Sequence, residues 1–258
     1  MNSVFHLPRS FAAAAGLSLA LGAMPAAAAE FSPSQKKEIE SVIRDYLIQN
    51  PEVLQEALVA LEKRQQDLQR TAQRNALLSE AKALYESPAN IVVGNPKGDV
   101  TLVEFFDYNC GYCKRAMADV AELVKKDTNL RVVLKDFPVL GPDSVEAAYV
   151  ALAVKHQLTG DKYFEYHQRL MASKGRVGKD RAMAVAKDMG LDTAKLAKDM
   201  EGKDVRAAIE ETVRLGDKLA LSGTPAFIVG EEIIPGAVGY EPLKAAVDAA
   251  RNNAKPTR

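Results

Sequence analysis

Apolar positions between residues 32 and 61 recur with the spacing of two short amphipathic helices. Ser32-Pro33-Ser34-Gln35 is a capping-box pattern with proline at the first helical position, and Asn50-Pro51 is a second helix start. Apolar residues follow each start at alternating intervals of three positions and one position: Ile39, Val42, Ile43, Tyr46 and Leu47 in the first stripe, and Val53, Leu54, Ala57, Leu58 and Leu61 in the second. We therefore predict two helices, each with an apolar face that needs a cover.

The stretch from residue 62 to residue 75 keeps helix-forming residues but has only Leu68 as a large apolar side chain. Such a polar helix is typically solvated or connects two bodies. Continuing the heptad places polar or small residues in the seam, namely Gln65, Ala72, Asn75 and Ser79, which is too polar for a long coiled coil. Residues 30–86 are thus predicted to be a helical oligomerisation region with a linker helix, in which residues 32–61 make the bundle. The alternative is that residues 32–61 fold back and cap the core of the following domain.

From residue 87 to residue 255 the pattern changes to short apolar strands alternating with helices. Strands are predicted at residues 91–93, 100–106, 130–137, 226–229 and 232–234, with a helix at 110–126 and a last helix at 241–251. The strand, helix, strand order from residue 100 to residue 137 is a βαβ unit with parallel strands. Residues 144–221 read as several helices inserted between the two halves of a small sheet. The predicted class is α/β, preceded by an all-helical extension.

The first 29 residues have the organisation of a cleaved export signal. Arg9 is basic, residues 11–24 are apolar, and Pro25 is followed by a run of alanines that ends before Glu30. The apolar run is shorter than the roughly 20 residues that span a bilayer, although a retained membrane anchor is the alternative. We expect residues 1–29 to be a signal peptide and the exported chain to be soluble in an oxidising compartment.

The balance of charge argues against nucleic acid or an anionic membrane surface as a partner. Because only Arg9 is charged within residues 1–29, the remainder has 33 basic and 34 acidic residues. The chain has two cysteines, too few and too close for a secreted disulfide scaffold. A close pair in an exported protein favours redox catalysis.

That pair is Cys110-Gly111-Tyr112-Cys113, at the junction between a predicted strand and a predicted helix. A helix N-terminus stabilises a thiolate, so Cys110 is expected to be the exposed nucleophile and Cys113 the shielded resolving thiol. Gly111 and Tyr112 add no positive charge beside the thiolate, which predicts a mild oxidant. No cofactor is expected beyond a redox-active Cys110–Cys113 disulfide.

Zinc is the alternative use of two such cysteines. A tetrahedral site needs four ligands, and outside the signal only His156 and His167 could add imidazoles. Both histidines lie in the helical insertion, where surface or packing roles are expected. We predict no metal site.

The arrangement resembles the DsbA-like branch of the thioredoxin fold over residues 88–252. The motifs that carry the resemblance are Phe105-Phe106 ahead of Cys-Gly-Tyr-Cys, Gly223-Thr224-Pro225 ahead of a Phe-Ile-Val strand, and the helical insertion between them. The helical extension is similar to oligomeric members of that branch, such as the ScsC-type suppressor-of-copper-sensitivity proteins. The Cys-Gly-Tyr-Cys sequence and the threonine before the proline also resemble DsbC-type isomerases, and depart from the Cys-Pro-His-Cys of the main DsbA oxidases.

Glu104 interrupts an apolar strand and is expected on the same face as Leu102 and Phe106. There it should be buried, with a raised pKa unless it is paired. The resemblance implies that such an acid assists proton transfer around the resolving cysteine, and Lys135 in the next strand is a possible ion-pair partner. The alternative is a buried structural ion pair.

Thr224 and Pro225 stand at the start of a predicted strand, where proline is unusual. The resemblance implies a cis bond between them that faces the cysteines, with the Thr224 backbone free to pair with an extended substrate peptide next to Gly111 and Tyr112. An ordinary turn proline is the alternative.

The resemblance implies a periplasmic thiol:disulfide interchange protein. We expect an oligomeric isomerase, dimeric or trimeric through residues 32–61, that acts on misfolded or unfolded secreted proteins. A DsbA-type oxidase and a chaperone or copper-handling thiol protein are the alternatives. The expected redox partner is a membrane protein of the DsbD/ScsB or DsbB type.

Overall fold

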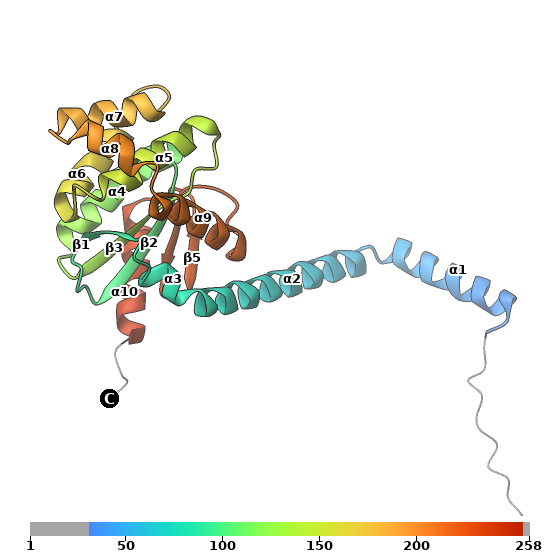
Figure 1. Cartoon of the computed structure of the whole chain (residues 1–258). Helices are drawn as coiled ribbons and strands as arrows, with labels where there is room; N and C mark the ends of the chain where they lie inside the picture. The colour runs from blue at the N-terminus through green and yellow to red at the C-terminus, as the bar shows by residue number, and fades with distance from the viewer. Residues whose placement is uncertain (1–30, 255–258) are drawn as a thin grey trace, which may run out of the picture. The chain divides into compact units, whose positions relative to one another are not determined.

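The computed structural model describes residues 31–254, which contain two compact units divided between Leu61 and Glu62 (Figure 1). The predicted signal peptide at residues 1–29 lies outside the described residues. Among the described helices, none combines the length and apolar composition that crossing a membrane requires.

The first unit contains α1 (Pro33–Gln49) and the beginning of α2 (Glu52–Ser79). The predicted capping box is present, because the Gln35 N–H donates to the Ser32 hydroxyl and the Ser32 N–H donates to the Gln35 side chain. α1 ends at Asn50, whose backbone and side-chain N–H groups both donate to the Tyr46 carbonyl. Pro51 then separates the two helices, as the sequence predicts.

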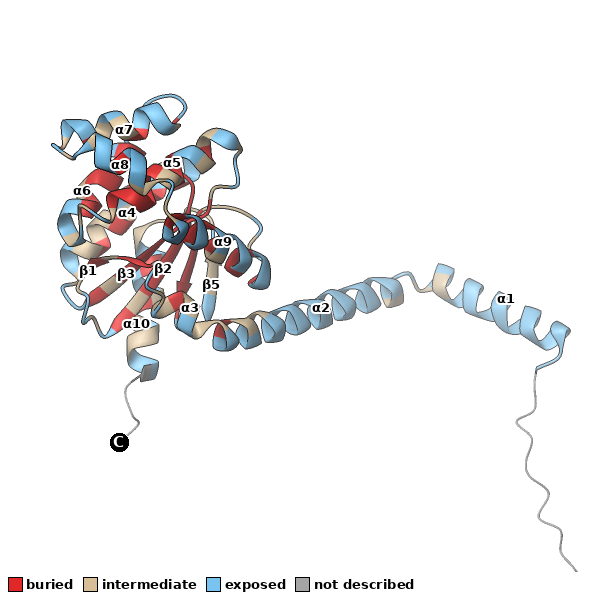
Figure 2. Ribbon diagram, viewed as in Figure 1, coloured by how far each residue is buried: buried red, intermediate tan, exposed pale blue. Residues whose placement is uncertain are grey.

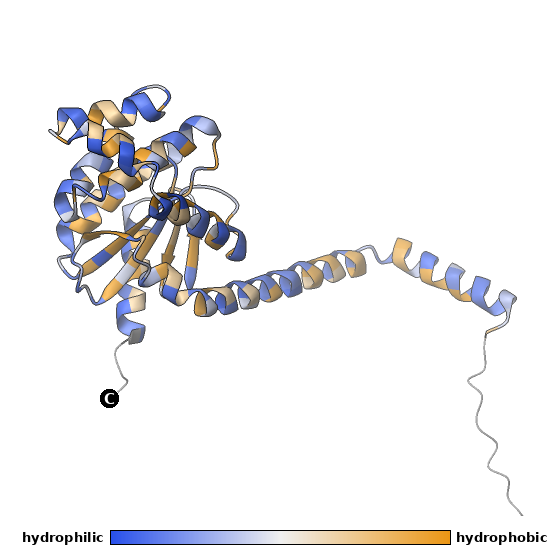
Figure 3. Ribbon diagram, viewed as in Figure 1, coloured by the Kyte–Doolittle hydropathy of each residue, from blue (hydrophilic) through white to orange (hydrophobic). Residues whose placement is uncertain are grey.

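The predicted apolar stripes of this unit are largely exposed. α1 contains no buried residue, and large apolar side chains on both helices are open to solvent, including Val42, Tyr46, Leu54 and Leu58. Figure 2 shows the exposure of these helices, and Figure 3 shows the apolar residues spaced along them. Exposed stripes of this kind are typical of surfaces that another chain covers.

The second unit is built on a five-stranded sheet in the order β1-β3-β2-β4-β5. Its strands are β1 (Ile91–Gly94), β2 (Val100–Phe106), β3 (Leu130–Asp136), β4 (Ala226–Val229) and β5 (Glu232–Pro235). β2 and β3 are parallel, as predicted, and the other neighbours are antiparallel. The end of β2, the end of β3 and the start of β4 therefore meet at one edge of the sheet.

One face of the sheet, called the α4 face here, carries the larger core. Leu102, Phe106 and Val132 point to this face and join one apolar cluster with α4 (Gly111–Lys126) and α10 (Tyr240–Ala254). The helical insertion adds to the same cluster. It consists of α5 (Pro142–Val154), α6 (Gly160–Met171), α7 (Lys179–Asp188), α8 (Thr193–Asp199) and α9 (Lys203–Lys218).

The opposite face, called the α9 face here, is covered by α9, by α3 (Ala81–Tyr85) and by the end of α2. Val103 and Phe105 point to this face and pack with Leu77, Leu84 and Leu215. The cover of the sheet thus begins at Leu77, before residue 87, where the sequence places the start of the catalytic domain.

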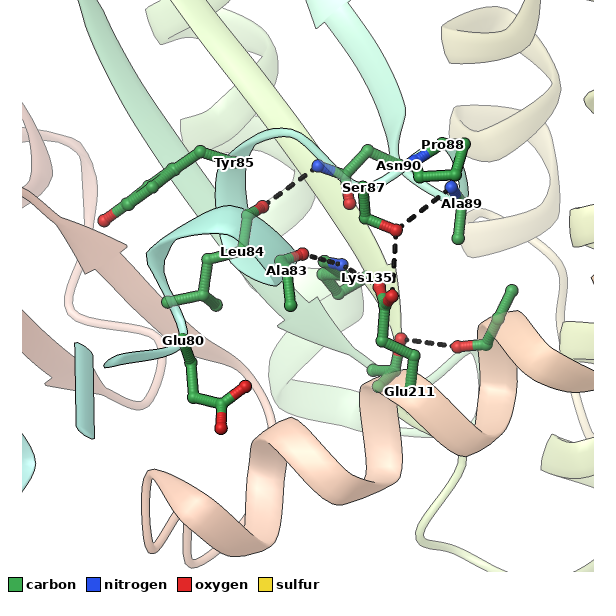
Figure 4. A network of polar contacts seen from close by, with 12 residues as sticks. Glu80, Ala83, Leu84, Tyr85, Ser87, Pro88, Ala89, Asn90, Lys135 and Glu211 are labelled. Atoms are coloured by element: carbon green, nitrogen blue, oxygen red, sulfur yellow. Dashed lines mark hydrogen bonds and ion pairs between the residues drawn. The ribbon is translucent and has the colours of Figure 1, made fainter. Parts of the chain in front are cut away.

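Polar contacts hold this early segment in place (Figure 4). The Lys135 ammonium donates to the Ala83 carbonyl and to Glu211, both at 2.9 Å, and the Ser87 hydroxyl donates to the other Glu211 oxygen. Glu80 of the same segment pairs with Arg214 at 2.8 Å. The end of α2, α3 and the segment that follows them are therefore an integral part of the second unit.

Candidate active site

Cys110 is the N-cap residue of α4, with extended backbone angles (φ −79°, ψ 117°) and no side-chain cap. The strand β2 ends at Phe106, and four residues turn the chain so that the sulfur lies at the positive end of the helix dipole. The Sγ atom lies 3.2 Å from the Thr224 carbonyl oxygen. Cys110 was predicted to be exposed, but it retains only 7% of its surface, because the Thr224 segment lies against it.

Cys113 lies in the first turn of α4 and is fully buried. Burial raises the pKa of its thiol well above the usual range, and the nearby Glu104 charge raises it further. Hydrogen bonds with the Asp107 backbone and the Thr224 side chain oppose this effect without cancelling it. The two thiols, which are not bonded to each other here, are therefore chemically unequal.

Glu104 lies on the α4 face and is buried, as the strand alternation predicts. Its Oε2 atom has no hydrogen-bond partner. Burial raises the pKa of this carboxyl group to about 8. At neutral pH the group is therefore mostly protonated and can exchange a proton with a neighbour.

Lys135 is not the partner of Glu104, so this prediction was wrong. The parallel register places Lys135 beside Phe105, one position beyond Glu104, and its side chain therefore points to the α9 face. There Lys135 is 3% exposed and pairs with Glu211. The sheet itself separates the two charged groups.

The Thr224–Pro225 peptide bond is cis, which confirms the prediction. β4 starts directly after it and runs antiparallel beside β2, so Thr224 reaches the edge of the sheet where Cys110 lies. Pro225 accepts a hydrogen bond of 2.8 Å from the Gly236 N–H.

The two residues between the cysteines differ in their surroundings. Tyr112 is 58% exposed, and the Arg115 guanidinium lies 5.0 Å from the centre of its ring. Around Gly111 there is open space where a Cβ atom would lie. The surface between the two cysteines is therefore open at both residues.

Sequence reasoning missed two polar residues of the turn before Cys110. Asp107 accepts hydrogen bonds from the Asn109 N–H, the Ser144 hydroxyl and the Leu140 N–H, at 2.7, 2.7 and 3.0 Å. The Asn109 side chain pairs with the Val177 backbone. Asp and Asn between a strand and a helix are a turn signal, but their partners in the insertion leave no local pattern.

Two further buried titratable residues lie on the α4 side. His167 accepts or donates a 3.1 Å hydrogen bond with the Tyr108 hydroxyl, and burial lowers its pKa to about 3. Asp136 has no hydrogen-bond partner for either carboxyl oxygen, and burial raises its pKa well above the usual range. His167 is the packing residue expected, and His156 lies near the surface, 2.8 Å from Asp204. Within residues 31–254, no three potential ligands among His, Cys, Asp and Glu come together in a way that could hold a metal ion.

Comparisons with known proteins agree with this geometry. A family model described as thioredoxin matches residues 86–249, and one described as the N-terminal domain of the copper resistance protein ScsC matches residues 35–67. The structure of a thioredoxin-like oxidoreductase from Silicibacter pomeroyi is 44% identical, with a TM-score of 0.63, over 66% of this chain and 97% of that one. Proteus mirabilis ScsC in a compact conformation is 33% identical, with a TM-score of 0.63, over 86% of this chain and all of that one.

A curated relative, the Na⁺/H⁺ antiporter NhaA 1 of Salinispora arenicola, is 31% identical over 62% of this chain but only 24% of its own length. The chain thus spans about a quarter of the first curated relatives it matches, and the likeness extends to one part of them. By its family match and its structural neighbours, the chain belongs to the thioredoxin family, in its DsbA-like, ScsC-type branch.

Proposed function

We propose that the protein is an oligomeric disulfide isomerase of the periplasm that repairs mispaired cysteines in secreted proteins. The observation that carries the proposal is the exposed apolar stripe on α1 and the start of α2, within the residues that match the ScsC N-terminal domain. An isomerase must hold a substrate while its disulfides are exchanged, and joined copies of one site can do so.

The exchange begins when the Cys110 thiolate attacks one sulfur of a substrate disulfide. A mixed disulfide forms, and the other substrate sulfur leaves as a thiolate. For isomerisation, a second substrate thiolate attacks the mixed disulfide, forms the new substrate bond and releases the Cys110 thiolate. No net electrons are transferred, so this cycle needs no oxidant.

Attack by Cys113 is the competing way to resolve the mixed disulfide. Its thiolate would attack the Cys110 sulfur, release a reduced substrate thiol and leave the Cys110–Cys113 disulfide, which a membrane reductase of the DsbD/ScsB type would reduce. Only the thiolate form of Cys113 is nucleophilic. Because the pKa of this thiol is raised, only a small fraction of it is present as thiolate. The minor fraction of Glu104 that is ionised at neutral pH would accept the Cys113 proton. Slow attack by Cys113 lengthens the lifetime of the mixed disulfide, which favours isomerisation.

The Thr224 backbone and the open space at Gly111 and Tyr112 would bind the substrate chain beside the thiols. A peptide in extended conformation can pair with backbone groups next to a proline, and the exposed Tyr112 ring offers apolar contact. These contacts do not read a particular sequence, as suits an enzyme with many secreted substrates.

The stripes on α1 and on the start of α2 are apolar, whereas residues 62–75 after them are mostly polar. We therefore assign assembly to residues 32–61. The apolar area on α1 and the start of α2 would become the core of a bundle of two or three chains. Export through the predicted signal at residues 1–29 would deliver the chain to the periplasm.

A copper-handling role is the second candidate, because the N-terminal match is described as a copper resistance protein. The Cys110 and Cys113 thiols are soft ligands of the kind that Cu(I) prefers. Retention of copper by the wild-type protein, and its loss from a Cys110→Ser/Cys113→Ser variant, would support this role.

The test is reactivation of scrambled ribonuclease by the exported chain, by the same chain lacking residues 30–75, and by Leu58→Lys. The matched control is Leu78→Lys, since Leu78 is an equally exposed leucine of α2 beyond the stripe. We expect the truncated chain and Leu58→Lys to become monomeric and to lose reactivation, while Leu78→Lys keeps both. Reactivation absent even from the wild type, with oxidation of reduced ribonuclease intact, would instead identify a DsbA-type oxidase.

A further inference from the structure

The residues on either side of the Cys-Gly-Tyr-Cys motif are both bonded to one loop of the helical insertion. This loop, residues 172–178, connects α6 to α7. Asn109, just before the motif, bonds to Val177, and Lys114, just after it, donates a 2.7 Å hydrogen bond to the Ser173 carbonyl. Hydrogen bonds therefore hold the active-site turn at both ends to a loop that lies 59 to 68 residues further along the chain.

Asn109 makes the more specific of these contacts. Its Nδ2 donates to the Val177 carbonyl at 2.8 Å, and its Oδ1 accepts from the Val177 N–H at 2.8 Å. A side-chain amide that bonds both the N–H and the carbonyl of one residue fixes the distance and the orientation of the turn. The second Nδ2 hydrogen reaches the Ser144 hydroxyl at 3.0 Å.

Ser144 links this pair to the backbone just before Cys110. Its hydroxyl donates to Asp107 Oδ1, which also accepts the Asn109 N–H, while the Cys110 N–H donates to the Asp107 carbonyl at 3.0 Å. Asp107 and Ser144 are both buried, so water does not replace these bonds easily.

The same loop, residues 172–178, and the residue after it are also bonded to α5. Arg176 forms an ion pair with Asp143, and the Lys179 N–H donates to Glu146 at 3.2 Å. Asp143, Ser144 and Glu146 all belong to the first turns of α5. The contacts form one continuous network from α5, through the loop, to the nucleophile.

We propose that Asn109 is a positioning residue that sets the reactivity of Cys110, and that the helical insertion thereby tunes the redox potential of the Cys110–Cys113 pair. The sulfur anion is stabilised by N–H groups at the start of α4, and this stabilisation depends on where the turn holds Cys110. A loosened turn stabilises the thiolate less, so the reduced form loses stability relative to the disulfide. The inference rests on thiol–disulfide exchange by Cys110 and is independent of isomerase activity.

The test is the Asn109→Ala variant of the full exported chain, equilibrated with reduced and oxidised glutathione. We expect the equilibrium to shift about three- to tenfold toward the Cys110–Cys113 disulfide, which corresponds to roughly 15 to 30 mV for a two-electron couple. The ultraviolet absorbance of the thiolate should titrate at higher pH in the variant. The equilibrium is measured on the protein's own thiols, so it does not depend on the substrate or on assembly.

Asn95→Ala is the matched control. The Asn95 side chain also bonds backbone in both directions, donating to the Thr128 carbonyl and accepting from the Lys97 N–H, both at 2.9 Å, but at the opposite edge of the sheet. This control should leave the glutathione equilibrium and the thiolate titration unchanged. An unchanged equilibrium in Asn109→Ala would overturn the proposal.

Ser144→Ala is the second variant, in case Asn109→Ala does not fold. It removes the hydroxyl between Asp107 and Asn109 but keeps the pairing with Val177. We expect a shift of about twofold in the same direction, since one of the links is lost. Wild-type equilibrium and titration in Ser144→Ala would count against the network as a determinant of the potential.

Discussion

The two faces of the central sheet treat buried ionisable side chains differently, as Lys135 and Glu104 show from adjacent strands and one register position apart. On the α9 face, Lys135 is paired with Glu211 and also donates to the Ala83 carbonyl. On the α4 face, Glu104 has an oxygen with no partner, beside a buried thiol. A fully bonded buried charge holds segments together, whereas an unbonded one next to a reactive group is available for chemistry.

Removal of Glu211 should have the largest effect on stability. Glu211→Leu leaves the Lys135 ammonium buried without a counter-ion, so we expect the free energy of unfolding to fall by about 3 to 5 kcal/mol. Denaturant unfolding measures the loss, and Glu210→Leu on the exposed side of α9 is the control. The double variant Lys135→Met/Glu211→Leu should recover most of the stability. A loss below about 1 kcal/mol in Glu211→Leu would make the pair no stronger than a surface pair.

The pH dependence of stability should differ between wild type and Glu104→Gln. The folded pKa of Glu104 is about 8, above its unfolded value, so the folded state holds the extra proton between these values. The contribution of Glu104 to the free energy of unfolding is therefore fully present below its unfolded pKa. It falls as pH rises toward 8, by about 1.4 kcal/mol per pH unit. Between pH 5 and pH 7, the unfolding free energy of the wild type should fall by roughly 2 to 3 kcal/mol relative to the variant. If the unfolding free energies of wild type and Glu104→Gln changed in parallel with pH, Glu104 would ionise near its ordinary pKa.

Gly216→Ala should disturb the α9 face more moderately. The added Cβ would lie 2.4 Å from the Phe137 ring, an overlap that usually costs about 1 to 3 kcal/mol. The better helix propensity of alanine returns about 1 kcal/mol, so we expect a net loss of up to about 2 kcal/mol in thermal or denaturant unfolding. Gly111→Ala is the matched control, because nothing lies within 4 Å of its added Cβ. Equal stability of the two variants would mean that α9 can shift away from Phe137.

Arg74→Ala should have the smallest effect. Arg74 and Glu231 form an ion pair at 2.9 Å, but both side chains are more than half exposed. Exposed pairs contribute less than about 1 kcal/mol, and this contribution should shrink further at high salt. Denaturant unfolding at low and high salt measures it. A loss as large as that of Glu211→Leu would erase the distinction between buried and exposed pairs.

Sequence periodicity predicted what depends on one element at a time. Strand alternation predicted that Glu104 is buried, the junction between a strand-like and a helix-like run placed Cys110 at the start of α4, and Pro51 marked the separation of α1 from α2. The cis bond before Pro225 followed from the family resemblance and is present.

Relations between elements were harder to predict. The side that Lys135 faces depends on the register between β2 and β3, and a shift of one residue reverses it. The partners of Asn109 lie in a loop 68 residues away, and Asp107 reaches Leu140 and Ser144 across the sheet edge. The covering of Cys110 by the Thr224 segment likewise joins residues 114 positions apart. Such contacts exist only once the fold has formed, so they leave no periodicity in the chain.

The helical insertion leaves the sheet after β3 and re-enters it at β4, and both points lie at the edge that holds Cys110. The sheet can therefore accept insertions of different lengths here without any change in strand order. For protein engineering, this makes the insertion an exchangeable cassette whose two junctions flank the reactive sulfur. A graft, a protease cut or a fused sensor within it would be mechanically connected to the thiol at both ends, so redox behaviour would report on events in the cassette.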